Sequence, residues 1–362
     1  TVGAISSTAG SVTTNEKSNT RDISDTTGSV TTGDHSTTGN ISSTTGSVTT
    51  GYGSGTGDIS NTTGSVTTGD YSGTGDISTT GGSVTTGNHS GTGNISTTTG
   101  SVTTGDNSTA GNISNTNGFV TTGAGSTVGN IDGVGGNVKV QGTAGYVNDT
   151  NGTNGVTLVN ATITGGTGKA GIDNTMVGNV TQSGNNSKIT GSTYGISNTK
   201  GSVILSGVDK GSATVTGGTD GGIAKTGGNV DLVNEEVTTT GGDGVSDTTG
   251  YVSANNTTIT GGTNGISKTT GNVSVTNNSS VTGNAGAGIT DTAGATGVTL
   301  NSATVEGKGG AGIANTTVGS VIQTANNSKI TGSTYGIYNT KGSVNLSGVD
   351  KGSATVTGGT EG

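Results

Sequence analysis

The acidic side chains that could support catalysis are concentrated in one short segment. Carboxylates act as acids, bases and nucleophiles in glycoside cleavage, and they also bind divalent cations. The densest group lies within one repeat and consists of Asp231, Glu235, Glu236, Asp243 and Asp247. An active site on a coil would need such groups to converge from neighbouring repeats. Those repeats provide the hydroxyls of Ser202, Ser212, Ser253 and Thr258 instead, so the pattern favours solvated turn charge and leaves catalysis as an alternative.

The two histidines, His35 and His89, are the other residues with distinctive chemistry. Both stand five residues after a valine, and Lys17, Tyr71 and Asn107 take the same place in other repeats. Three strand spacings of about 4.8 Å would separate the two imidazoles, which is too far for a shared metal ion. A calcium-binding roll needs a tandem nonapeptide, and its nearest match, at 241–247, occurs once. We therefore expect a variable, solvent-facing turn and neither a metal nor another cofactor.

The composition excludes several classes of protein. Of 362 residues, 76 are glycine, and proline, cysteine and tryptophan are absent. Hydrophobic residues make up 25%, too few for the broad core of a compact enzyme, so we predict that the chain is not an enzyme. The net charge is −9, with a single arginine, and no run of about 18 apolar residues occurs. We therefore expect no nucleic-acid partner and no membrane insertion by this segment.

Aliphatic residues recur with a fixed period of 18 in the first part of the chain. One series is isoleucine, from Ile5 and Ile23 to Ile131, and the other is valine, from Val12 and Val30 to Val138. A fixed period indicates one unit stacked on copies of itself, and its Thr, Ser, Val and Gly content predicts short strands between tight turns. We predict an all-β fold, a single-stranded parallel β-helix (β-solenoid), and we expect it to be right-handed.

The first aliphatic residue of each module marks a rung, which gives 17 rungs. After Ile131 the markers are Val147, Ile172, Ile196, Ile223, Val245, Ile266, Ile289, Ile313 and Ile337. The third residue after the marker is almost always Thr, which predicts a ladder of hydroxyls near a corner.

The rungs change in character along the chain. The early rungs contain 18 residues, whereas the later rungs contain 21 to 27. Each later rung also has a third aliphatic residue, such as Ile259, and three nearly equally spaced aliphatic residues predict a triangular coil. Strand alternation points the second residue after each valine into the coil. This residue is leucine in many of the later rungs, as at Leu205, and threonine in the early rungs, as at Thr32. We therefore expect a thin solenoid with a polar core at 1–138 and a wider triangular β-helix at 139–362.

A longer repeat is superimposed on the rungs. The segment N-N-S-K-I-T-G-S-T-Y-G-I begins at Asn185 and again at Asn326, so this longer period is 326 − 185 = 141. The identity continues through the turn G-V-D-K-G, at 207–211 and 348–352. Because the second copy stops at Gly362 and the chain begins inside a rung, we expect a fragment of a longer polypeptide.

Glycine-rich runs with aliphatic punctuation occur throughout, as in I-T-G-G-T-N-G-I-S-K-T-T-G-N-V-S-V from Ile259 to Val275. This architecture resembles the passenger domains of Gram-negative autotransporter adhesins and the related filamentous-haemagglutinin-like exoproteins, over essentially the whole chain. The resemblance implies export across two membranes, an extracellular location on the bacterial cell surface, and adhesion or self-association. The absence of cysteine is consistent with passage through an oxidising periplasm.

Two sets of residues are candidates for contact with a partner. The first is the turn G-V-D-K-G, which lengthens its rung and provides Val208, Asp209, Lys210, Val349, Asp350 and Lys351. The second is a column of Asp and Asn that repeats at the rung spacing: Asp58, Asp76, Asn94 and Asn112. Because each rung offers the same weak contact, avidity can replace one strong pocket. We expect a structural stalk or binding segment of a secreted adhesin, whose partners are host-cell or neighbouring-cell ligands or further copies of itself.

Two other functions stay open from the sequence. A carbohydrate-active β-helix enzyme would use the carboxylates described above. An ice-binding β-solenoid would use the regular Ser/Thr pairs that flank the inward valines, such as Ser65/Thr67 and Ser83/Thr85. Ser and Thr are also ordinary residues of a soluble sheet face, and Phe119 replaces the serine in the last regular rung, so the adhesin is favoured.

Overall fold

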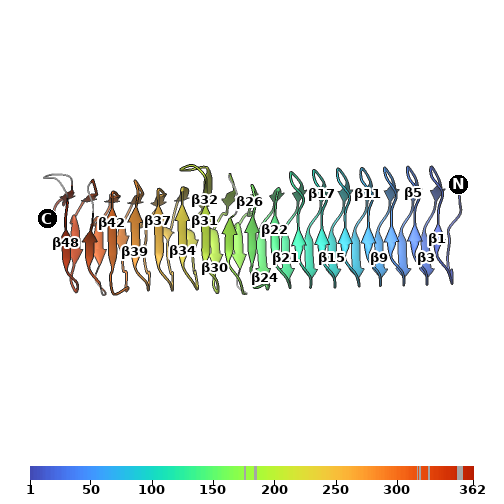
Figure 1. Cartoon of the computed structure of the whole chain (residues 1–362), viewed down its shortest axis with the longest axis horizontal. Coiled ribbons are helices and arrows are strands. Elements are labelled where there is room, and N and C mark those ends of the chain that lie inside the picture. Colours follow the sequence, from blue (N-terminus) through green and yellow to red (C-terminus); the bar gives the residue numbers. More distant parts are fainter. Residues whose placement is uncertain (175–176, 183–185, 316, 318, 325–326, 349–353) are drawn as a thin grey trace. The chain divides into compact units, whose positions relative to one another are not determined.

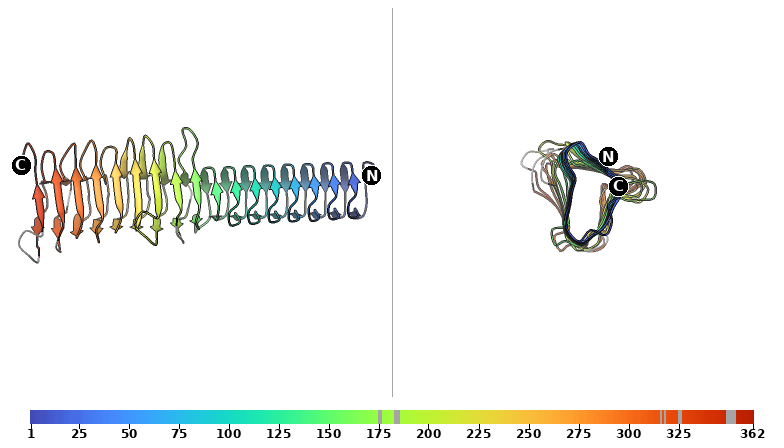
Figure 2. Two further views of the ribbon diagram at one scale, coloured as in Figure 1. Left: turned by 90° about the horizontal axis from the view of Figure 1, so that it is seen from above. Right: turned by 90° about the vertical axis from the view of Figure 1, so that its right-hand side faces the viewer.

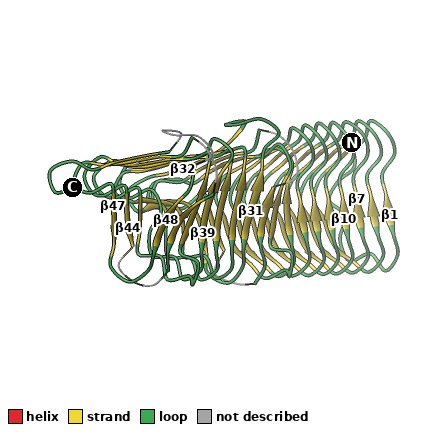
Figure 3. Ribbon diagram, turned by 60° about the vertical axis from the view of Figure 1, so that its left-hand side comes forward, coloured by secondary structure: helices red, strands yellow, loops and turns green. Residues whose placement is uncertain are grey.

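The fold consists of short parallel strands joined by turns, and the described residues contain no helix (Figures 1 and 3). The computed structural model describes residues 1–174, 177–182, 186–315, 317, 319–324, 327–348 and 354–362. The predicted all-β parallel solenoid is confirmed, and end-on views show three-sided coils (Figure 2). The chain divides into two compact units, Thr1–Thr157 and Leu158–Gly362. The boundary at 138/139 and the right hand of the coil stay predictions.

In the first unit each coil carries strands on three faces. The valine face comprises β1 (Val12–Thr13), β4 (Val30–Thr31), β7 (Val48–Thr49), β10 (Val66–Thr67), β13 (Val84–Thr85), β16 (Val102–Thr103), β19 (Val120–Thr121) and β22 (Val138–Val140), and is followed by β25 (Val156–Leu158). The isoleucine face comprises β3 (Ile23–Thr26), β6 (Ile41–Thr44), β9 (Ile59–Thr62), β12 (Ile77–Thr80), β15 (Ile95–Thr98), β18 (Ile113–Thr116), β21 (Ile131–Val134) and β24 (Val147–Thr150). The third face comprises β2 (Asn19–Thr20), β5 (Thr37–Thr38), β8 (Gly55–Thr56), β11 (Gly73–Thr74), β14 (Gly91–Thr92), β17 (Thr109–Ala110), β20 (Thr127–Val128) and β23 (Thr143–Ala144). Val12 pairs with Val30 and Ile23 with Ile41, so the repeat period sets the register, as predicted.

The second unit has the same three faces. Its valine face comprises β28 (Val180–Gln182), β31 (Val203–Ser206), β34 (Val230–Val233), β37 (Val252–Asn255), β39 (Val273–Thr276), β42 (Val298–Asn301), β45 (Val321–Gln323) and β48 (Val344–Leu346). Its isoleucine face comprises β27 (Ile172–Asn174), β30 (Tyr194–Asn198), β33 (Gly221–Ala224), β36 (Asp243–Val245), β41 (Ile289–Thr290), β44 (Ile313–Asn315) and β47 (Ile337–Asn339). Its third face comprises β26 (Thr162–Thr164), β29 (Lys188–Thr190), β32 (Ala213–Gly217), β35 (Glu235–Thr239), β38 (Thr258–Gly261), β40 (Ser280–Gly283), β43 (Thr304–Gly307), β46 (Lys329–Gly332) and β49 (Thr355–Thr357). Val237 pairs with Ile259, which confirms that the third aliphatic forms a column of its own.

The predicted number of 17 rungs is slightly too high, because the coil makes about 15 turns. Within the described residues the isoleucine face carries eight strands in the first unit and seven in the second. At Ile5 and Ile266 this face has only isolated bridges to its neighbours. Ile266 is nevertheless fully buried, so its side chain keeps its place in the aliphatic column although no strand forms around it.

The core of the first unit combines aliphatic and hydroxyl columns. Ile23 and its equivalents up to Ile131 are fully buried, and so is Thr26, three residues after Ile23, at 1% exposure. Simple alternation along a strand would point that threonine outward. Asp25 between them has a φ of +53°, which breaks the alternation and returns Thr26 to the interior. The equivalent residues Ser43, Asn61, Thr79, Thr97 and Asn115 share this conformation, so the predicted hydroxyl ladder forms at a corner.

Candidate functional site

The five acidic residues of the densest group do not converge. Asp231 lies in β34 on the valine face, and Glu235 and Glu236 lie in β35 on the third face. Asp243 and Asp247 lie in and just after β36 on the isoleucine face. The coil turns corners between these strands, so residues that are close in sequence end up on different sides. Among the described residues, no three His, Cys, Asp or Glu side chains are grouped closely enough to hold a metal ion.

The two acidic residues on the isoleucine face have protein partners. Asp243 accepts hydrogen bonds from the hydroxyl of Ser267 and from the backbone and side-chain N–H groups of Asn264, at 2.9 and 3.0 Å. Asp247 pairs with Lys268 at 3.9 Å, and both side chains are exposed. Each carboxylate therefore contacts the next coil, and its charge contributes to the contact between coils.

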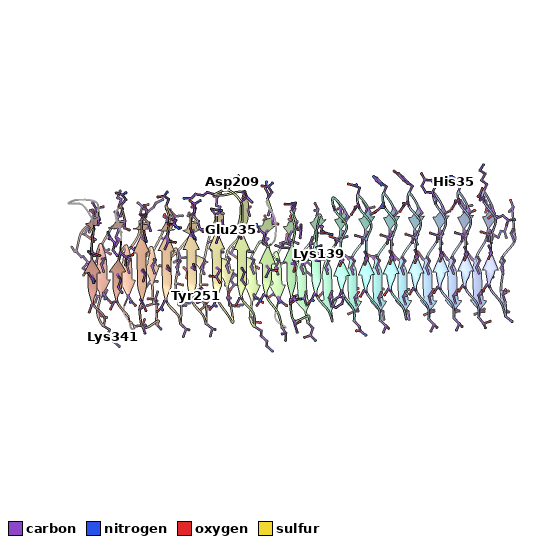
Figure 4. The ribbon with its side chains drawn as sticks, in the orientation of Figure 1. His35, Lys139, Asp209, Glu235, Tyr251 and Lys341 are labelled. Atoms are coloured by element: carbon purple, nitrogen blue, oxygen red, sulfur yellow. The ribbon has the colours of Figure 1, made fainter. Side chains whose placement is uncertain are left out.

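Glu235, labelled in Figure 4, is the exceptional carboxyl of this group because it is buried in the interior of the coil. Its side chain is fully buried, and Oε1 accepts a hydrogen bond from Nε2 of Gln182 at 3.3 Å. Burial raises the pKa of Glu235 to about 7, and hydrogen bonds from the Gly207 backbone and from Gln182 offset part of that increase. A carboxyl without access to solvent cannot meet a polysaccharide, so its chemistry is confined to holding or releasing a proton inside the coil.

The column of Asp and Asn predicted to contact partners forms a ladder of capped backbone amides. The N–H of Asp76 donates to Oδ1 of Asp58 at 2.9 Å, and the N–H of Asn94 donates to Oδ1 of Asp76 at 2.7 Å. Asn112 continues the pattern through Oδ1 of Asn94 at 2.9 Å. One oxygen of each side chain is thus committed to the next coil. The second polar atom lies at the exposed surface, where a partner could meet it.

Three members of this column, Asp58, Asp76 and Asn94, line a groove of about 530 Å³ in the first unit, and Asn112 lies outside its lining. Its lining consists of alternating carboxylate or amide and hydroxyl side chains from five successive coils: Asp22, Ser24, Asn40, Ser42, Asp58, Ser60, Asp76, Ser78, Asn94 and Ser96. Glycine precedes most of these Asp and Asn residues for a steric reason. A Cβ on Gly75 would stand 2.2 Å from Oδ1 of Asp58, where the capping oxygen lies. The pair of Gly with Asp or Asn is therefore the sequence signal of the groove.

The turn that contains Val208, Asp209 and Lys210 is exposed (Figure 4). Hydrogen bonds to Asn234 and Asn278 hold it against the coils. Nδ2 of Asn234 donates to the carbonyl of Val208 at 3.0 Å. Nζ of Lys210 donates at 2.7 Å to the carbonyl of Asn278, between β39 and β40. Val208 remains 63% exposed, so the turn offers one apolar side chain to a partner. Its copies Val349, Asp350 and Lys351 lie outside the described residues.

One exposed feature that the sequence did not predict is an aromatic stripe, which consists of His35, Tyr52, Tyr71 and His89. Successive ring centroids lie 5.4, 5.4 and 4.8 Å apart, and the last pair is parallel to within 4°. The expected solvent-facing turn is present, since all four residues are exposed. Tyr52 is hidden from a comparison at the fixed period because Gly53 stands in the column of His35, Tyr71 and His89, and Tyr52 precedes it by one residue. A comparison that tolerates a shift of one residue would have found the stripe.

The serines of the regular Ser/Thr array on the valine face already form hydrogen bonds between successive coils. The N–H of Ser65 donates to the hydroxyl of Ser47, and the N–H of Ser83 donates to the hydroxyl of Ser65, each at 3.2 Å. Thr67 and Thr85 point outward and are exposed. The face therefore presents a threonine column beside serines that already cap backbone amides.

These features define a β-solenoid repeat protein with repeated polar surfaces. No protein-family model, no curated protein and no solved structure matches this chain. Within the described part of the chain, no helix has the length and apolar character needed to cross a membrane.

Proposed function

We propose that this chain is a non-enzymatic stalk or binding segment of a secreted bacterial surface adhesin, and that it mediates attachment to a neighbouring surface or self-association. The observation that carries the proposal is the groove of Asp, Asn and Ser, which presents nearly the same polar atoms in five successive coils. Several weak contacts of one kind act together when a partner also repeats, so affinity arises from avidity. The architectural resemblance of the glycine-rich rungs to adhesin passengers supports the extracellular location.

The chemistry of the groove suits a polar, repetitive partner. The capping bonds fix the direction of each side chain, so little conformational freedom is lost when the remaining polar atom is bound. The dispersal of the acidic residues over three faces favours a binding role over the hydrolase alternative. The partner is a cell-surface ligand or another copy of the chain.

Filling the groove tests this proposal. Beads coated with the protein should cluster with each other or bind to cells, and Ser60→Arg with Ser78→Arg should abolish both effects by obstructing the groove without removing a capping oxygen. The matched control is Thr67→Arg with Thr85→Arg, which adds the same charge to the valine face. The proposal fails if coated beads neither cluster nor bind cells, or if both pairs of substitutions act equally. Polysaccharide turnover that Asp243→Asn abolishes would establish the hydrolase instead.

A further inference from the structure

Aromatic side chains are scarce in this chain, yet four rings come together on the equivalent turns of four successive coils. The sequence has seven tyrosines, one phenylalanine and two histidines, and both histidines belong to the stripe. Tyr52 is 46% exposed and Tyr71 is 56% exposed. Tyr52 is turned 83° from His35 and 57° from Tyr71, so it is not stacked in parallel with either neighbour. Exposed tyrosines held in place by their neighbours are well suited to binding, since they offer a large contact area at a low entropic cost.

The surroundings of the stripe are strongly acidic. Residues 22–138 contain eight acidic residues and no lysine or arginine. Asp34 and Asp70 stand immediately before the stripe residues His35 and Tyr71, Asp106 follows two coils further on in the same column, and all three are exposed. Oδ1 of each accepts the backbone N–H of the next coil at 2.7 Å, which fixes the direction of the carboxylate. A partner at this surface must supply positive charge.

The spacing of the three carboxylates indicates the shape of that partner. Two coils at the strand spacing of about 4.8 Å place successive carboxylates roughly 9.6 Å apart. A polyproline II helix has three residues per turn and a rise of about 3.1 Å per residue, so one turn advances about 9.3 Å. A cation at every third residue would therefore meet successive carboxylates from one side of such a helix.

We propose that the aromatic stripe, with Asp34, Asp70 and Asp106, binds an extended polypeptide segment that has arginine or lysine at every third residue in a polyproline II conformation. Its cations pair with the carboxylates, and its aliphatic stems and proline rings cover Tyr52 and Tyr71. This surface shares no residue with the Asp/Asn groove. The inference therefore stands independently of the adhesin proposal.

The test uses the whole chain and a fluorescein-labelled peptide of five Arg-Pro-Ser repeats, followed by fluorescence anisotropy at low salt. The triple variant Asp34→Asn, Asp70→Asn, Asp106→Asn keeps the capping oxygens, because Asn88 in the same column already caps Asp106 through Oδ1 at 2.8 Å. The matched control Asp22→Asn, Asp58→Asn, Asp76→Asn removes the same charge from the groove. We expect at least an about tenfold loss of affinity for the first triple variant and about twofold or less for the second.

Two further comparisons separate recognition from simple attraction of opposite charges. Tyr52→Ser with Tyr71→Ser leaves the charge unchanged and should also weaken binding about tenfold, whereas Tyr251→Ser, at an exposed tyrosine of the second unit, should not. A peptide of equal composition, in which the spacing between arginines alternates between two and four residues, should bind more weakly. Equal losses in the two triple variants, or tighter binding of an Asp-Pro-Ser peptide, would overturn the proposal. So would a stripe-dependent dimer in sedimentation, because the occupant would then be a second copy.

Discussion

Replacing Glu235 with glutamine should stabilise the second unit at neutral and alkaline pH and change little at acid pH. Burial raises the pKa of this carboxyl to about 7 from the ordinary value of 4.5. The folded chain therefore holds the proton more tightly than the unfolded chain does. The associated stability is fully present below pH 4.5, is lost as the pH rises toward 7, and stays lost above it.

The size of the effect follows from the two pKa values. Their difference, 7 minus 4.5, is about 2.5 pH units, which corresponds to about 3 kcal/mol. Glutamine is neutral at every pH and keeps an oxygen that can accept the Gly207 N–H. We therefore expect the variant to exceed the wild type in free energy of unfolding by about 3 kcal/mol at pH 8 and to differ by less than about 1 kcal/mol at pH 4. The charged side chains of the adjoining turn, Asp209 and Lys210, are exposed to solvent.

Urea unfolding followed by circular dichroism from pH 4 to pH 8 measures this difference, and amide exchange in β35 locates it. The control is Glu236→Gln, which changes the adjacent, outward-facing carboxyl in the same strand. A gain that does not depend on pH would refute the assignment of the effect to the buried proton. An equal gain from Glu236→Gln would show that general charge repulsion is responsible.

Three further predictions concern the first unit. Gly51→Ala should lower the melting temperature strongly, because a Cβ there would stand 2.5 Å from the carbonyl carbon of Gly33, whereas Gly73→Ala meets open space and should be nearly neutral. Asp58→Ala should cost about 1 kcal/mol in urea unfolding by removing the acceptor for the Asp76 N–H, and Asp58→Asn should cost little. The first unit should exchange its amide protons faster than the second, because two of its columns of buried threonine, those of Thr20 and Thr26, have hydroxyls without hydrogen-bond partners in the described structure; uniform protection would contradict this.

The register of the coils could be predicted because one residue type dominates each column. A fixed period leaves a single way to bury both series, and the observed pairing of Val12 with Val30 follows from it. The conformation of the corner could not be predicted in the same way. Asp25, Thr79 and Asn115 all adopt positive φ there, and such residue types give no common signal for it.

The candidate sites were harder to predict because sequence distance is a poor guide to distance on a coil. Asp231 and Asp243 are near each other in the chain but lie on different faces. Tyr52 and Tyr71 are separated by one position more than the period, yet their rings are neighbours. The extra length of the turn at 207–211 indicated an insertion. The bond from Lys210 to Asn278, which depends on the reach of a side chain, had no counterpart in the spacing.

In the part of the chain that the structure describes, the coil lacks a side-chain hydrogen bond to the next coil at Tyr52 and presents an exposed aromatic ring instead. Its column holds Asp34 and Asp70, whose side-chain oxygens cap the amide of the next coil. A tyrosine has no carboxylate or amide oxygen, so at this position the coil forgoes a capping bond worth about 1 kcal/mol. The ring regains a similar amount from His35 and Tyr71, since an aromatic pair contributes about 0.5–1.5 kcal/mol. Stability is therefore nearly unchanged by the exchange, while the surface gains an exposed ring between two fixed carboxylates, which is the contact area that the proposed binding of a cationic segment requires.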